Sequence, residues 1–216
     1  MNLMSKLVLT ISLTSIVSLA DTTYQVDYQE MPRYTEVVNQ LEYVNMPSYD
    51  GVNKWWLCGH AAFSTAINVL RTTDAKDVDQ LEWFHKQLTG YEEYKNDIHK
   101  QAKGDFLAQI MNNRDDYIAI KESQMDRSKI KTKLQNELKN DKRQQLVVLT
   151  QYKGWGHFVV LYKIHTKEND EQGGIVQYAD PYGGHSSKTM GYKDFLNGMK
   201  NAGTKDRYSF WIIREK

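Results

Sequence analysis

The chain has 216 residues, of which 40% are hydrophobic and 25% are charged, and this balance is ordinary for a globular protein. Its formal net charge of +1 gives no electrostatic basis for binding nucleic acid or an anionic membrane surface, so we expect neither partner. The part that follows a short N-terminal leader has the length of one domain with a core of its own.

Residues 1–20 predict a secretory signal peptide. Lys6 supplies a positive charge, residues 7–17 form an uncharged apolar run, and Ser18-Leu19-Ala20 places small residues before Asp21. The apolar run is too short to cross a hydrocarbon core of ~30 Å as a helix. We expect cleavage near Ala20, a secreted or periplasmic protein, and no stable membrane insertion afterwards. An uncleaved anchor or a buried helix is the alternative.

Residues 21–48 are polar and aromatic and predict an irregular or extended lead-in that wraps the domain. After it, the spacing of apolar residues predicts helices, and runs of β-branched and aromatic residues predict strands. The predicted helices cover residues 58–71, 77–88, 94–112, 129–140 and 194–200. The predicted strands cover residues 146–151, 157–164, 175–179 and 208–214, with a polar hairpin loop at 167–174. Helices followed by antiparallel strands predict an α+β domain.

The only cysteine, Cys58, stands where the first predicted helix begins. It has no partner for an internal disulfide, so it is a buried inert thiol, a thiol that pairs with another chain, or a nucleophile. The first N–H groups of a helix carry a partial positive charge, which favours a thiolate and stabilises an oxyanion beside it. Its place at the helix start therefore favours the nucleophile.

A thiolate nucleophile needs a base, and His157 is the best placed of six histidines. It follows a glycine-rich turn and opens an apolar strand, while Asp180 ends the next strand just before Pro181. If these strands form a hairpin, the start of one lies beside the end of the other. Asp180 then orients the imidazole, as an acid does in a catalytic triad. A simple turn-forming role for Asp180 is the alternative.

Three segments together resemble the papain-like cysteine peptidases. They are Cys58-Gly59-His60-Ala61 at a helix start, Gly156-His157-Phe158-Val159-Val160-Leu161, and Asp180-Pro181 followed by Gly184. The closest likeness is to the C39-like group, which is related to bacteriocin-processing peptidases, and it covers residues 49–216. The resemblance implies a papain-like fold, with N-terminal helices packed on a C-terminal antiparallel sheet. It also implies Cys58 as nucleophile, His157 as general base and acid, and Asp180 as orienting group.

Two positions depart from the family pattern. His60 stands where the family commonly has Pro or Ser. The family also carries a glutamine about six residues before the nucleophile, as a donor to the oxyanion, and Val52 stands there. Asn53 is the predicted substitute donor, with the Trp55-Trp56 region as the alternative source.

The resemblance implies a monomeric hydrolase that acts on a peptide or protein substrate through a thioester acyl-enzyme, without cofactor or metal. Deamidation and transglutamination on the same scaffold stay open, because a triad alone does not separate these outcomes. A binding module that keeps the scaffold without catalysis is a further alternative. A zinc site built from Cys58, His60, His157 and Asp180 is another, although two ligands one residue apart at a helix start are awkward for one tetrahedral ion.

Overall fold

The fold is taken from a computed structural model, which describes residues 24–33, 36–41, 57–72, 83–84, 87, 103–140, 142–167, 173–202 and 208–216. In this part of the chain a mixed set of helices and strands forms an α+β domain around one antiparallel sheet. The predicted α+β class is therefore confirmed.

The sheet has seven strands in this part of the chain, all paired antiparallel. They are β1 (Tyr24–Tyr28), β2 (Tyr117–Gln124), β3 (Gln144–Tyr152), β4 (Trp155–Lys167), β5 (Gly174–Asp180), β6 (His185–Gly191) and β7 (Tyr208–Glu215). Six of them run in the order β2-β7-β3-β4-β5-β6, and β1 pairs with the far end of β4. The consecutive strands β3, β4, β5 and β6 are thus neighbours in space.

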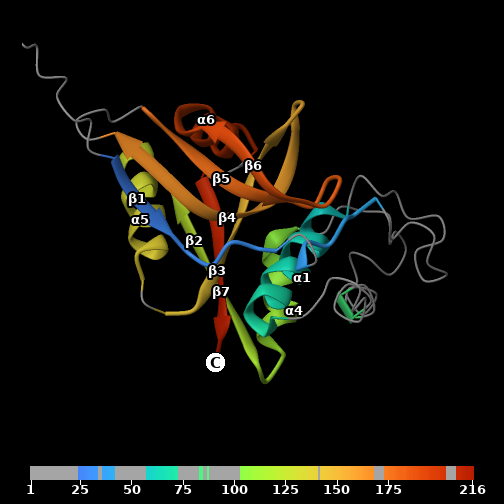
Figure 1. The fold of residues 1–216 in the computed structure, drawn as a ribbon. Helices are drawn as coiled ribbons and strands as arrows, with labels where there is room; N and C mark the ends of the chain where they lie inside the picture. The colour runs from blue at the N-terminus through green and yellow to red at the C-terminus, as the bar shows by residue number, and fades with distance from the viewer. Residues whose placement is uncertain are drawn as a thin grey trace, which may run out of the picture.

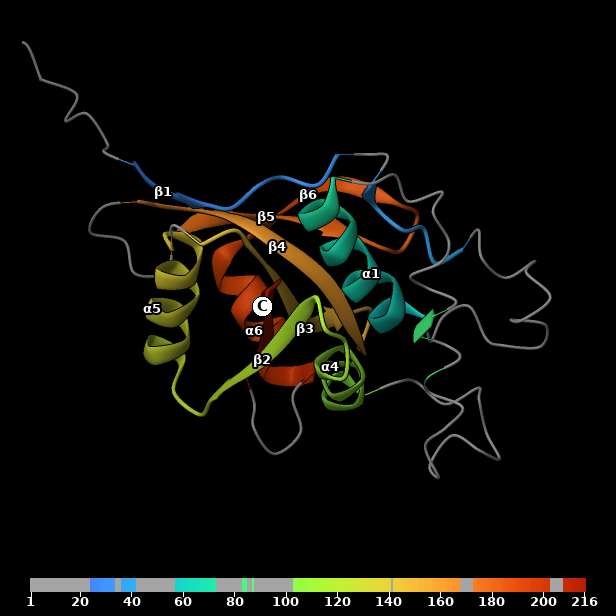
Figure 2. The ribbon, with the colours of Figure 1, turned by 90° about the horizontal axis from the view of Figure 1, so that it is seen from below.

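Four helices in the described residues cover this sheet: α1 (Cys58–Arg71), α4 (Gly104–Asn112), α5 (Arg127–Leu138) and α6 (Tyr192–Ala202). Figure 1 shows α1 and α4 beside each other, away from α5 and α6, and the view from below in Figure 2 shows the strands running between the two pairs. The domain therefore has three layers, with a helix pair on each side of the sheet.

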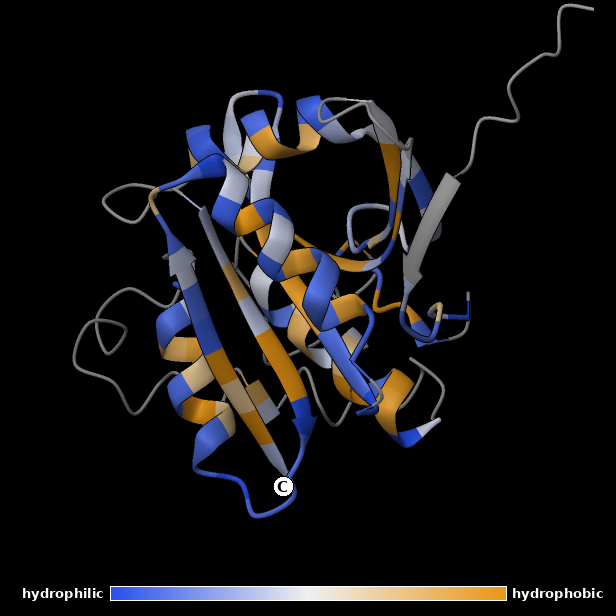
Figure 3. Cartoon of the chain, turned by 90° about the vertical axis from the view of Figure 1, so that its left-hand side faces the viewer, coloured by the Kyte–Doolittle hydropathy of each residue, from blue (hydrophilic) through white to orange (hydrophobic). Residues whose placement is uncertain are grey.

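The two faces of the sheet follow from alternation along its strands. On β3, Val147 belongs to the apolar cluster around α1 and α4, while Leu146 and Val148 belong to the cluster around α5 and α6. Successive side chains of a strand point to opposite faces, so one strand supplies both cores. Figure 3 shows the same arrangement, because the hydrophobic colouring follows the central strands and the inner faces of the helices.

The predicted elements agree with the structure over most of the described chain. The helix at 58–71 is confirmed with the same bounds, and those expected at 129–140 and 194–200 form as α5 and α6 with shifted ends. The four predicted strands form as β3, β4, β5 and β7. The helix expected at 94–112 is described from Gly104 on. Of the one expected at 77–88, only Trp83, Phe84 and Gln87 are described, and these are helical.

Three strands were not predicted, and they correct the expected order of helices first and strands afterwards. β1 lies within the lead-in, β2 lies between α4 and α5, and β6 lies between β5 and α6. The expected signal peptide at 1–20 lies outside the described residues. Among the described helices, none combines the length and the apolar character that a membrane span requires.

Candidate active site

Helix α1 places Cys58 at its first residue. Leu57 precedes it and has no side-chain group for capping, and the first intrahelical bond runs from the N–H of Ala61 to the carbonyl of Leu57 at 2.9 Å. The N–H groups of the first turn have no carbonyl partner inside a helix, and they give this end a partial positive charge. Cys58 therefore lies where negative charge on its sulfur is stabilised.

Close packing sets the position of this helix end. A Cβ atom on Gly59 would lie 2.8 Å from Cδ1 of Leu107 on α4 and 3.3 Å from Cδ2 of Phe158 on β4. Both neighbours are buried, so neither moves freely aside. Glycine at this position lets α1 approach β4 just where His157 precedes Phe158.

The predicted hairpin of β4 and β5 forms, and it brings His157 and Asp180 together. Val160 pairs with Ala179, which places the next residue of β5, Asp180, near the His157 end of β4. Nε2 of His157 lies 2.6 Å from Oδ1 of Asp180, and both side chains are buried. A charge-assisted bond of this length fixes the plane of the imidazole ring.

Two further donors hold the carboxylate of Asp180. The backbone N–H of Tyr182 donates to Oδ1 at 2.9 Å, and the ammonium of Lys188 donates to Oδ2 at 2.7 Å. Burial by itself would raise the pKa of Asp180, but the bonds from His157, Lys188 and Tyr182 outweigh it and hold that pKa below its ordinary value. Asp180 is thus a carboxylate over the physiological pH range.

His157 bonds to Asp180, and Cys58 lies near enough to affect its pKa. Because Nε2 faces Asp180, the other ring nitrogen, Nδ1, is the one available to the sulfur. Burial by itself would lower the pKa of His157, but the bonds to Asp180 and Cys58 and their charges raise it to about 9. The imidazole is therefore protonated at neutral pH and bonded to the carboxylate of Asp180.

Part of the lead-in ties α1 to the turn that follows Asp180. The N–H of Val38 donates to Oγ1 of Thr65 on α1 at 3.0 Å, and the N–H of Gln40 donates to the carbonyl of Pro181 at 3.0 Å. Nδ2 of Asn68, also on α1, donates to the carbonyl of Glu36 at 3.2 Å. Residues 36–41, here called the strap, therefore connect the element that carries Cys58 to the turn after Asp180.

Aromatic rings surround the His157 side of the site. The ring of Tyr152 lies 5.7 Å from that of His157 and 5.5 Å from that of Tyr182, measured between centroids. Trp155, two residues before His157, is 79% exposed and is the first residue of β4, opposite Tyr152. An apolar rim of this kind limits the access of water to the imidazole and offers flat surfaces to a ligand.

The three central side chains are themselves well covered: Cys58 and Asp180 are each 1% exposed and His157 is 7% exposed. The low exposure of Cys58 differs from that of a solvent-accessible thiol at a helix start. The thiol thus lies near a histidine, as a catalytic nucleophile does, but it is buried like a structural cysteine.

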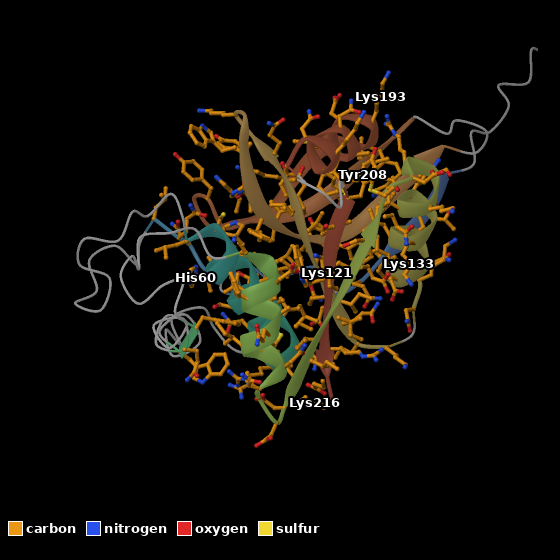
Figure 4. All side chains as sticks on the ribbon, turned by 180° about the vertical axis from the view of Figure 1, so that it is seen from behind. His60, Lys121, Lys133, Lys193, Tyr208 and Lys216 are labelled. Carbon is orange, nitrogen blue, oxygen red and sulfur yellow. The ribbon has the colours of Figure 1, made fainter. Side chains whose placement is uncertain are left out.

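The other predicted site residues fall in different places. Asn53 and Val52 lie outside the described residues. His60 lies on α1 and is buried (Figure 4). The described residues contain no group of three or more histidine, cysteine, aspartate or glutamate side chains that could hold a metal ion. Lys188 and Tyr152 were not predicted, because the pairing of β6 with β5 and the turn of β3 bring them to the site.

The chain matches no family model and no curated protein. Its function is therefore inferred from its own residues.

Proposed function

We propose that this protein is an exported cysteine hydrolase with a papain-like fold of the C39-like kind, acting on peptide or related amide bonds. The observation that supports it most is the bond between His157 and Asp180, with Cys58 near enough to raise the pKa of His157. Each of these residues was expected on sequence grounds, and each comes from a different element. The α+β layering, with the thiol on a helix and the imidazole on the sheet, fits the same family.

In the proposed reaction, the thiolate of Cys58 attacks the carbonyl carbon of the scissile amide. The resulting oxyanion is stabilised by N–H groups at the start of α1 and by Asn53. The C–N bond then breaks as the His157 imidazolium gives its proton to the leaving amine, which leaves a thioester on Cys58. Water next attacks this thioester, His157 takes up its proton, and the acid product leaves.

Asp180 takes no proton in this scheme. It holds the imidazole by Nε2, so that Nδ1 stays directed at the sulfur, and it stabilises the imidazolium through its charge. The strap supports this arrangement because it joins α1 to the turn after Asp180. Export through the signal peptide at 1–20 belongs to the same proposal.

The experiment compares wild type with Cys58→Ala, His157→Ala and Asp180→Asn on a broad peptide library, with cleavage products identified by mass spectrometry. Loss of cleavage is expected for the first two variants, and weakened cleavage for the third. A matched control is Ser123→Ala, a change on β2 that removes only a weak contact with Ser209. Cleavage by Cys58→Ala at the wild-type rate would contradict the mechanism.

A second candidate function is a binding module that keeps the scaffold without catalysis, and the observation that favours it is the 1% exposure of Cys58. The two functions predict different reactivity for the thiol of Cys58. An activated Cys58 reacts with iodoacetamide in the native protein, whereas a structural thiol reacts only after unfolding.

A further inference from the structure

Lys188 makes a contact that a minimal Cys-His-Asp site does not need. Its ammonium lies 2.7 Å from Oδ2 of Asp180, the oxygen that His157 does not use. The Lys188 side chain is 29% exposed and that of Asp180 only 2% exposed, so the lysine reaches the carboxylate from the surface side. The two oxygens of one buried carboxylate therefore each face a cationic group when His157 is protonated.

The pairing of β6 with β5 produces this contact. Lys188 lies directly opposite Tyr178, and the register shifts between Tyr178 and Asp180, so that Asp180 is opposite His185. Without the shift, the residue opposite Asp180 would be Ser186. Because Lys188 is opposite Tyr178, it stands diagonally across from Asp180 and joins the same hydrogen-bonded group as His157.

The titratable and charged groups around His157 and Asp180 come from several elements. They are Cys58 of α1, Tyr152 at the end of β3 and Lys153 after it, Tyr178 of β5, Tyr182 of the following turn, and His185 and Lys188 of β6. The only cation among them that bonds to Asp180 besides His157 is Lys188. It also lies 6.0 Å from the centre of the Tyr152 ring, which in turn packs against His157.

We propose that Lys188 is a positioning residue of this site, which acts through Asp180. Its ammonium fixes the carboxylate so that Oδ1 points at His157, and its charge offsets part of the negative charge that His157 meets. This inference rests on the proposed function, because it assigns Lys188 a part in the same reaction.

The charge of Lys188 affects proton transfer from His157. A carboxylate shared with a lysine attracts the imidazolium proton less strongly than a carboxylate that serves His157 alone. General acid catalysis is most efficient when the pKa of the acid lies near the working pH. By this account Lys188 keeps the imidazolium from becoming too weak an acid to protonate the leaving amine.

The experiment follows the titration of the His157 ring by nitrogen NMR in the purified protein, in wild type, Lys188→Met, Lys188→Gln and Lys188→Arg. Removal of the charge in the Met and Gln variants should raise the pKa of His157 by about half a unit to one unit. Lys188→Arg should restore the wild-type titration. Lys193→Met is the matched control, since Lys193 is an exposed lysine on α6 (Figure 4), and it should titrate as wild type.

Circular dichroism checks that each variant is folded. A His157 pKa unchanged in folded Lys188→Met and Lys188→Gln would overturn the proposal. If both neutral variants lose the folded state, Lys188 contributes to stability alone, and the proposal is overturned as well. The readout needs no substrate, so a protein that fails to cleave peptides but shows the shift would contradict the proposed function and leave the role of Lys188 in place.

Discussion

Nε2 of His157 and Oδ1 of Asp180 lie 2.6 Å apart and join the two strands of one hairpin through their side chains. Since the carboxylate is buried, water competes little for this hydrogen bond, which is therefore stronger than one at the surface. The first prediction concerns the loss of that charge. Asp180→Asn should lower the pKa of His157 and reduce kcat/KM at least about 10-fold, because the imidazolium loses its counter-charge.

The measurement is the pH dependence of kcat/KM, with the His157 titration beside it. Asp180→Asn should move the alkaline limb towards acid pH, which is opposite to the shift expected for Lys188→Met. If the alkaline limb of the pH profile lies at the same pH in Asp180→Asn and in wild type, the bond between His157 and Asp180 is structural only.

The second prediction concerns the alkaline limb of the proposed activity in the wild-type protein. The reactive form pairs a thiolate with a protonated imidazole, and the pKa of His157 is raised to about 9. Activity should therefore persist through neutral pH and fall as the pH rises through about 9. A limb near the ordinary histidine value of ~6.5 would contradict this.

The same pKa shift predicts the pH dependence of stability. A group whose pKa is higher in the folded state stabilises the fold below its unfolded pKa and loses that contribution as the pH rises through the folded value. For His157 the stabilisation is complete below about 6.5 and is lost towards about 9. The free energy of unfolding, measured with urea, should fall over this interval in wild type and fall less in His157→Phe.

The third prediction concerns the packing of α1 against β4. Gly59→Ala should destabilise the protein by about 1–3 kcal/mol, because the added Cβ would lie 2.8 Å from Leu107 in a closely packed core. Gly156→Ala is the matched control, since its added Cβ would meet only Leu149 at an ordinary 3.6 Å. Urea unfolding compares the two. Equal midpoints would mean that α1 does not depend on glycine at this position.

The fourth prediction concerns the strap. Thr65→Val removes the hydroxyl that accepts from the N–H of Val38 and leaves a buried donor without its partner. The expected cost is about 1–3 kcal/mol in the free energy of unfolding. Thr132→Val on the exposed side of α5 is the control, because its hydroxyl bonds within its own helix at an exposed site. If both variants unfold alike, the strap does not anchor α1.

Sequence patterns predicted the parts of this molecule that depend on local apolar spacing. Helix α1 was found with its observed bounds, because apolar residues recur on its faces, and β3, β4, β5 and β7 were found because their runs are strongly apolar. The contact of His157 with Asp180 was also predicted, since a polar loop between two such runs indicates a hairpin.

The remaining strands carry weak local signals. β6 has the sequence HSSKTMG, without an apolar run, and it forms at the edge of the sheet by pairing with β5. β2 combines a short apolar stretch with the polar residues KESQ and lies between two helices. β1 forms through its pairing with the far end of β4. Such strands are determined by tertiary pairing rather than by their own sequence.

For the same reason, the sequence indicated neither the contact of Lys188 with Asp180 nor the bonds of the strap, although it predicted a lead-in that wraps the domain. Lys188 reaches Asp180 because β6 pairs with β5 and sets Lys188 opposite Tyr178, and the strap bonds through backbone groups of Val38 and Gln40. Backbone donors and the pairing of a polar edge strand leave no recognisable residue pattern. No sequence pattern predicts the burial of Cys58 either, since this burial depends on how the whole chain packs around the start of α1.

The most direct test of the central claim is the rate at which iodoacetamide alkylates Cys58 in the native protein near neutral pH, followed by intact mass. Cys58 is the only cysteine, so each added group reports on it alone. Wild type should take up one group without denaturant, and His157→Ala should react at least about 10-fold more slowly. Absence of labelling until urea unfolds the protein would contradict the claim that Cys58 is a nucleophile activated by His157.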